Sequence, residues 1–185
     1  MSRTLMIALG LSVLAGSLTF AQDQKASPPP QPTPGPEHAR LKKMEGTWDA
    51  VMTEADGKKT KGEMIYKMEC GGLWLVTNFE GEFGGTKFQG KGLDSYDAAK
   101  KKFIGIWVDS MTTSPMMVEG TYDEKTKTMT MTGEGKMPDG TLAKHRLVTK
   151  FTDKDHHTFE MFMTLPDGKE TSMMTIDYTR LPEKK

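Results

Sequence analysis

The feature that most constrains the fold is a series of ten short segments in which apolar or β-branched residues alternate with polar ones. A period of two is typical of strands with one buried face. The intervening sequences Asp56-Gly57, Gly84-Gly85, Pro138-Asp139-Gly140 and Pro166-Asp167-Gly168 accept positive φ and therefore predict tight hairpins. The expected strands are Gly46–Glu54, Thr60–Met68, Leu73–Phe83, Phe88–Asp97, Phe103–Asp109, Met116–Asp123, Thr128–Lys136, Leu142–Thr152, Thr158–Leu165 and Glu170–Arg180.

Short connections between neighbouring strands predict an antiparallel meander. Because closure removes the exposed edges of a sheet, we expect an all-β fold, an antiparallel up-and-down β-barrel of about ten strands. Ahead of the first strand, Glu37–Glu45 favours one short helix in which Leu41 and Met44 share a face. A chain of 185 residues suits one core, so we expect a single barrel domain over residues 37–185.

The N-terminal residues 1–21 have the pattern of a secretory signal peptide. Arg3 precedes the uncharged run Leu5–Phe20, and small residues at Thr19 and Ala21 predict cleavage after Ala21, with Ser17 as an alternative. An uncleaved membrane anchor is the other interpretation, although the run is short for a full span. We therefore expect a periplasmic or extracellular protein with no membrane span in the mature chain.

Residues 22–36 hold six of the ten prolines, which prevent both helix and sheet pairing. We expect this segment to be a disordered linker between the signal peptide and the barrel domain.

Charge and motif content exclude several classes of function. Basic and acidic residues balance at 25 each and the basic ones are scattered, which argues against a nucleic-acid partner. The sequence has no Gly-x-Ser-x-Gly, no P-loop and no dinucleotide fingerprint, so we expect no cofactor and consider an enzyme the weaker interpretation. An enzyme would have to use Asp109 or a histidine, and a turn aspartate that binds its own backbone explains Asp109 more simply.

Neither cysteine nor histidine forms a recognisable site. Cys70 is the only cysteine, so it excludes an intramolecular disulfide, and we expect it to be a partly buried structural residue. The histidines lack zinc-ligand spacing, and none lies on the last expected strand, where it could bind haem. We expect them on the surface; they are His38, His145, His156 and His157.

Methionine is abundant, with 16 residues. Pairs such as Met129 and Met131, or Met161 and Met163, place two thioethers on one face of a strand, which would suit Cu(I). Methionine is also an adaptable apolar core residue, and each pair lies where a barrel needs apolar side chains. Both interpretations stay open.

Gly46-Thr47-Trp48 at the first expected strand and Arg180 at the end of the last resemble the pairing found in the calycin superfamily. In lipocalin-like barrels, the tryptophan of Gly-x-Trp packs against a basic residue from the last strand. The resemblance implies that Trp48 and Arg180 close one end of the barrel by stacking and hydrogen bonding.

A longer set of motifs is similar to a bacterial family known as domain-of-unknown-function family 1579. The resemblance covers Leu41 to Leu181 and implies a calycin-like barrel in frequently exported proteins, without an activity. The motifs are Tyr96-Asp97, the run from Lys101 to Met111, Glu119-Gly120-Thr121-Tyr122-Asp123, Thr130-Met131-Thr132-Gly133-Glu134, His157-Thr158-Phe159-Glu160-Met161 and Tyr178-Thr179-Arg180.

The leading hypothesis is a barrel that binds a small apolar or amphipathic ligand in its lumen. The alternative is a structural or protein-interaction module of the cell envelope whose barrel is filled by its own side chains. The oligomeric state stays open. Candidate ligand-binding residues are Tyr66, Trp107, Met129, Met131, Phe159, Met161 and Met163.

Overall fold

The computed structural model describes residues 31–136, 140–165 and 167–183. The expected signal peptide, residues 1–21, and most of the expected linker, residues 22–36, lie outside the described residues, as do two of the predicted turn prolines, Pro138 and Pro166. The description below therefore concerns the barrel and the short segment that leads into it.

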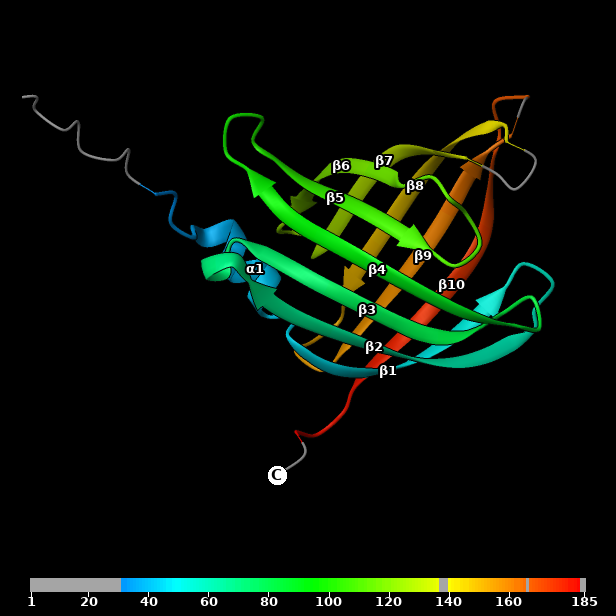
Figure 1. Ribbon diagram of the computed structural model, residues 1–185, viewed down its shortest axis with the longest axis horizontal. Helices are drawn as coiled ribbons and strands as arrows, with labels where there is room; N and C mark the ends of the chain where they lie inside the picture. The colour runs from blue at the N-terminus through cyan, green and yellow to red at the C-terminus, as the bar shows by residue number, and fades with distance from the viewer. Residues whose placement is uncertain (1–30, 137–139, 166, 184–185) are drawn as a thin grey trace, which may run out of the picture. The chain divides into compact units, whose positions relative to one another are not determined.

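Ten antiparallel strands pair with their sequence neighbours, and the last strand pairs with the first to close the barrel (Figure 1). The ten-stranded antiparallel barrel expected from the sequence is thereby confirmed. The strands are β1 (Gly46–Glu54), β2 (Lys59–Glu69), β3 (Trp74–Phe83), β4 (Thr86–Asp97), β5 (Lys102–Asp109), β6 (Met116–Asp123), β7 (Thr128–Lys136), β8 (Leu142–Phe151), β9 (His156–Thr164) and β10 (Glu170–Arg180).

A single helix, α1 (Pro36–Lys42), precedes the barrel. It begins one residue earlier than expected because Pro36 suits the first helical position, and it ends three residues earlier. Leu41 is buried, and the helix contacts β2, β3 and β4, so it lies across one end of the barrel (Figure 1). We refer to this as the α1 end. The odd-numbered strands begin at the α1 end and the even-numbered strands finish there, because consecutive strands run in opposite directions.

The connection between β2 and β3 is a short 3₁₀ turn, Cys70–Gly72. Cys70 is exposed there, so the expectation of a partly buried cysteine is wrong. The reason is local: Cys70, Gly71 and Gly72 all take positive φ to reverse the chain between two strands, and the turn holds Cys70 outside the core.

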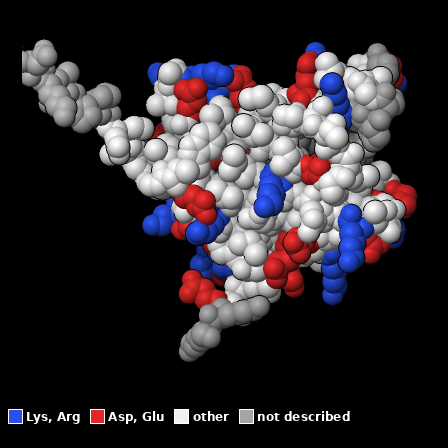
Figure 2. Space-filling model, in the orientation of Figure 1, with Lys and Arg blue, Asp and Glu red and all other residues white. Residues whose placement is uncertain are grey.

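On the face shown in Figure 2, basic and acidic side chains are interspersed, with uncharged surface between them. This view therefore shows no concentration of one sign of charge of the kind that steers a protein toward a polyanion.

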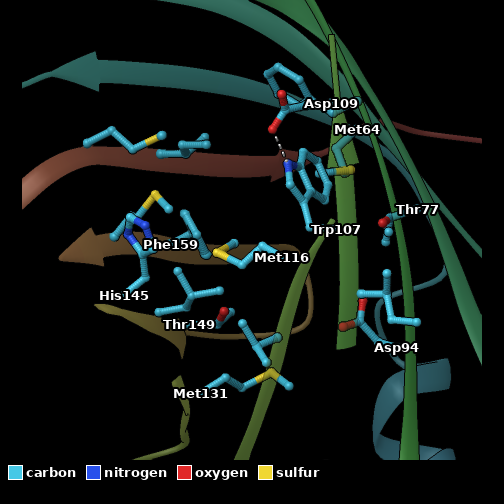
Figure 3. A pocket seen from close by; sticks show the side chains of 18 of the residues that line it. Met64, Thr77, Asp94, Trp107, Asp109, Met116, Met131, His145, Thr149 and Phe159 are labelled. Carbon is cyan, nitrogen blue, oxygen red and sulfur yellow. Dashed lines mark hydrogen bonds between the residues drawn. The ribbon is translucent and has the colours of Figure 1, made fainter. Parts of the chain in front are cut away.

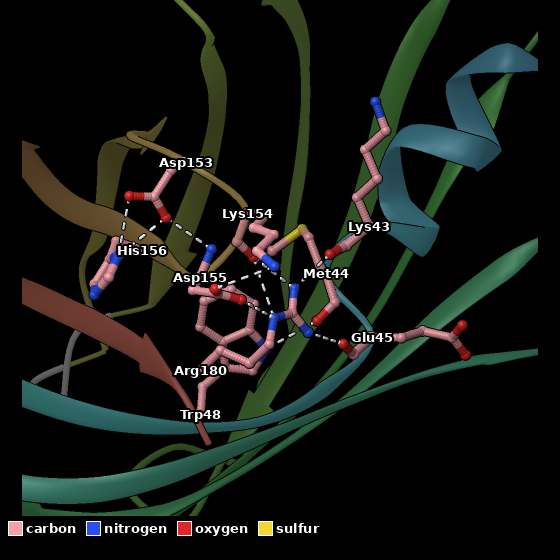
Figure 4. A network of polar contacts seen from close by, with 9 residues as sticks. All are labelled: Lys43, Met44, Glu45, Trp48, Asp153, Lys154, Asp155, His156 and Arg180. Atoms are coloured by element: carbon pink, nitrogen blue, oxygen red, sulfur yellow. Dashed lines mark hydrogen bonds and ion pairs between the residues drawn. The ribbon is translucent and has the colours of Figure 1, made fainter. Parts of the chain in front are cut away.

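Arg180 and Trp48 lie opposite each other in the register of β1 and β10, where the barrel closes. The Arg180 guanidinium carbon is 4.1 Å from the centroid of the Trp48 ring, a cation–π geometry. The Trp48 indole N–H in turn donates to the carbonyl of Met44 at 2.9 Å (Figure 4). This pair therefore ties the first and last strands to the segment that follows α1.

The guanidinium N–H groups of Arg180 donate hydrogen bonds to main-chain oxygens from two other parts of the chain (Figure 4). They reach the carbonyls of Lys43, at 2.7 Å, and Glu45, and that of Lys154, at 2.9 and 3.1 Å. Asp155 completes the network with an ion pair of 3.2 Å to Arg180 Nε. One guanidinium thus joins β10, the α1–β1 connection and the β8–β9 turn.

Gly46, the first residue of Gly-Thr-Trp, is required for two reasons. Its φ is +125°, which side chains rarely adopt, and a Cβ placed on it would lie 2.8 Å from an Arg180 guanidinium nitrogen. The glycine of this motif therefore makes room for the arginine.

We predict that Arg180→Ala lowers the free energy of unfolding by roughly 3 kcal/mol, because it removes the cation–π contact together with the hydrogen bonds to three main-chain carbonyls. Arg180→Lys should recover less than half of this loss, since lysine lacks the planar fork. Urea denaturation measures both effects.

Arg146→Ala is the matched control. Arg146 also lies over an aromatic ring, 3.9 Å from Phe162, but its ion pair with Glu170 is on the surface. Arg146→Ala should therefore lower the free energy of unfolding by no more than about 1 kcal/mol. Equal losses for the two alanine variants would show that Arg180 does not close the barrel.

Candidate ligand-binding cavity

A cavity of about 400 Å³ lies inside the barrel. Its wall is predominantly apolar and includes side chains from every strand, together with Leu41 and Met44 from the α1 end. Residues of the β5–β6 connection, Met111, Thr112 and Ser114, line it at the opposite end. The cavity therefore extends along much of the barrel axis.

The structure brings six of the seven candidate ligand-binding residues to this wall. Met163 is not among the lining residues: it lies beyond Met161 toward the far end of β9, beside the bulge at Ser172–Met174 of β10. The six that line the cavity are Tyr66, Trp107, Met129, Met131, Phe159 and Met161.

Asp94 is a lining residue that the sequence reasoning missed. It is half-buried on β4, and Figure 3 shows it near Thr77 of β3 in the cavity wall. Burial raises the pKa of the Asp94 carboxyl from 3.8 to about 7. The lumen thus contains an acid that is partly protonated near neutral pH.

The α1 end of the lumen is floored by four aromatic side chains, Trp48, Tyr66, His157 and Tyr178, which we call the aromatic floor. The His157 ring centroid is 4.5 Å from that of Trp48 and 4.5 Å from that of Tyr178, against which it stacks. Burial raises the pKa of both the Tyr66 and the Tyr178 phenol, and the two hydroxyls interact electrostatically with each other. The floor is therefore a packed aromatic cluster at this end of the lumen.

His157 corrects the expectation of surface histidines, since its side chain is only 2% exposed. The sequence placed it in a polar turn, whereas β9 begins at His156 and directs His157 into the aromatic floor. Neither ring nitrogen has a hydrogen-bond partner among the described residues. Burial, and then the charge of Arg180, lower the His157 pKa to about 4, so the ring is neutral at pH 7.

His145 and His38 are also buried, contrary to the expectation. His145 of β8 lines the cavity, its Nδ1 lacks a partner within the described part of the chain, and burial lowers its pKa. His38 lies in α1 and accepts a hydrogen bond from the Gly35 backbone N–H at 3.1 Å. His156 alone is exposed and contacts Asp153.

Asp109 lies near the end of the lumen opposite α1. Its carboxylate accepts the indole N–H of Trp107 at 3.1 Å and the backbone N–H groups of Met111 and Thr112 at 2.8 and 3.2 Å (Figure 3). Both oxygens are thus engaged within its own turn, as expected for a turn aspartate. The contact also fixes the Trp107 ring against the cavity.

Within residues 31–136, 140–165 and 167–183, no three His, Cys, Asp or Glu side chains come together as a metal site would require. In the same ranges, no helix has the length and apolar character needed to span a bilayer.

Comparison with protein families gives one match. The model of a family described as "Protein of unknown function (DUF1579)" matches residues 33–180. No curated protein matches the chain.

Among solved structures, the chain is similar to Rv2717c from M. tuberculosis, with 11% identity, a TM-score of 0.58, and coverage of 80% of this chain and 99% of that one. A redesigned β-barrel, b11L5F_LGL, is 18% identical over 77% of this chain and 95% of its own, with a TM-score of 0.41. A de novo designed fluorescence-activating β-barrel is 15% identical over 76% of this chain and 96% of its own, also with a TM-score of 0.41. At these identities, the likeness to Rv2717c shows a shared fold.

The raised pKa of Asp94 predicts a specific pH dependence of stability. The folded protein holds this proton more tightly than the unfolded chain, so the free energy of unfolding falls as pH rises from about 4 to about 7. An asparagine at position 94 cannot ionise, so Asp94→Asn should remove that loss of stability. We expect the free energy of unfolding of the variant to exceed that of wild type by on the order of 3 kcal/mol at pH 8 and by little at pH 4.

Urea denaturation at the two pH values measures the difference. The exposed strand residue Asp177 provides the matched control, Asp177→Asn, for which the difference from wild type should not grow with pH. An Asp94→Asn effect that is the same at both pH values would contradict the prediction.

Proposed function

We propose that this chain, which belongs to the family described as "Protein of unknown function (DUF1579)", binds a small apolar or amphipathic molecule in the barrel lumen. The observation that carries the proposal is the cavity of about 400 Å³, which lies within the range of about 300–1,000 Å³ typical of ligand pockets. Its predominantly apolar wall with a few polar groups is also typical of such pockets.

The cavity argues against the alternative, a barrel filled by its own side chains and used as a structural or interaction module. Empty apolar volume destabilises a protein by about 24 cal/mol per Å³, so a barrel selected for stability alone would fill its lumen.

Binding of the fluorescent apolar probe N-phenyl-1-naphthylamine tests the proposal. We expect wild-type protein to enhance the probe's emission in a saturable manner, because the ring system enters the lumen. Met161→Trp, which enlarges a lining side chain, should weaken this binding at least about tenfold, since the added ring occupies the same space.

Glu160→Trp is the matched control, because Glu160 precedes Met161 on β9 and points to the other face of the strand. It should leave the affinity for the probe unchanged. No saturable enhancement by wild type, or equal losses in the two variants, would overturn lumen binding.

A second candidate is Cu(I) binding, favoured by the methionine content of the wall. Ten methionines line the cavity, and a Cβ on Gly135 would lie 3.2 Å from His145 Nε2 and 3.4 Å from Met116 Sδ, so an imidazole and a thioether border the same small space. These are ligands that Cu(I) accepts. Competition with a chromophoric Cu(I) chelator decides between the candidates: binding weaker than micromolar rejects the copper site.

We also propose that the chain is exported, with its signal peptide removed after Ala21, on the basis of the pattern in residues 1–21. The intact mass of protein recovered from the periplasm or medium tests this. A chain beginning at Gln22 supports it, and a chain that retains Met1 in the membrane fraction contradicts it.

A further inference from the structure

We propose that Asp94 is the anchor for a positively charged amino group, so that the lumen selects lipophilic amines over alcohols and carboxylic acids of the same chain length. This inference rests on the proposed lumen-binding function and names its ligand class. Three features of the site support it: an unpaired carboxyl, the cavity that borders it, and its depth in that cavity.

The Asp94 carboxyl has no hydrogen bond or ion pair with any described residue, although it lines an apolar cavity. Buried carboxyls are ordinarily paired, because an unpaired charge loses its hydration without compensation. Among the described lining residues, Lys136 is the single lysine or arginine, and it lies at the end of β7 away from α1. The barrel therefore does not supply a cation for this carboxyl.

Several arginine and lysine side chains pair with carboxylates elsewhere in the described residues, and Asp94 takes part in none of these ion pairs. They include Arg40–Glu124, Lys58–Glu82, Lys67–Glu69, Lys102–Glu119, Arg146–Glu170 and Arg180–Asp155.

The lumen reaches the Asp94 carboxyl beside two glycines. Gly105 lies directly opposite Asp94 in the register of β4 and β5, and a Cβ there would be 2.5 Å from Asp94 Oδ1, so the carboxyl occupies the place that a side chain would take. Gly92, two residues earlier on the same face of β4, is likewise covered by Thr77, whose Oγ1 would be 2.3 Å from a Cβ. Asp94 and Thr77 both line the cavity, so an ammonium group could approach the carboxylate and the Thr77 hydroxyl from the lumen (Figure 3).

The position of Asp94 along the barrel fixes the orientation of the ligand. Asp94 is near the end of β4 that lies at the α1 end, whereas Trp107 and Asp109 are at the far end of β5. The methionine and phenylalanine side chains that line the rest of the lumen would contact the apolar part of the molecule. The amino group therefore lies deep and the hydrocarbon extends toward the end opposite α1.

The possible ligand classes differ in how the charge of their head group interacts with the Asp94 carboxylate. A ligand ammonium supplies the missing partner of the ionised carboxylate and donates charge-assisted hydrogen bonds. A carboxylic acid would place two acids together, so that one must hold a proton. An alcohol gains only a neutral hydrogen bond.

Isothermal titration at pH 8 with octylamine, 1-octanol and octanoate tests the proposal, because the three probes differ only in the head group. We expect wild type to bind octylamine at least about tenfold more tightly than 1-octanol, and octanoate most weakly. Asp94→Asn should remove the preference for the amine and change the affinity for 1-octanol less than about threefold.

Asp177→Asn, on the outside of β10, should leave all three affinities unchanged. If 1-octanol and octylamine bind with equal affinity to wild type and to Asp94→Asn, the lumen binds ligands but Asp94 is not the anchor. The same conclusion follows if Asp109→Asn, rather than Asp94→Asn, removes the preference. If none of the probes binds wild type, the proposed function itself fails.

Discussion

Closure of ten strands into one ring is the constraint on which the rest of this structure depends. The diameter of a barrel grows with its number of strands, and eight strands already give an interior that side chains just fill. Ten strands enclose more space, and the inward side chains of this barrel line that space without filling it. The cavity is therefore a consequence of the closure geometry.

The floor of the lumen and the wall just above it have different roles. At the α1 end, Arg180 joins three segments of backbone and covers Trp48, against which His157 of the aromatic floor packs. These contacts stabilise the barrel. Immediately above the floor, Asp94 retains unused hydrogen-bonding capacity in an apolar setting, which is the arrangement expected of a recognition group and not of a packing residue.

Much of the fold could be predicted because strand alternation and hairpin glycines are local signals, and the Gly-x-Trp and terminal arginine motifs pointed to Trp48 and Arg180. Asp94 could not. On β4 the apolar pattern is inverted: Gly90, Gly92 and Asp94 face inward, while Leu93 faces outward and is 42% exposed. His157 was misjudged for a similar reason, since polar neighbours at the β8–β9 turn concealed the inward side of a strand start. Both cases depend on barrel closure, which places residues from distant strands together and which no local pattern reports.

Methionine methyl NMR tests the central claim, an open lumen that receives a ligand, most directly. With ¹³C-methyl methionine, the account predicts that octylamine shifts the signals of lining residues such as Met116, Met131 and Met161. The signal of Met117, which is 64% exposed on the outer face of β6, should stay unchanged. Shifts confined to Met117, or no shifts at saturating amine, would contradict a ligand-binding lumen.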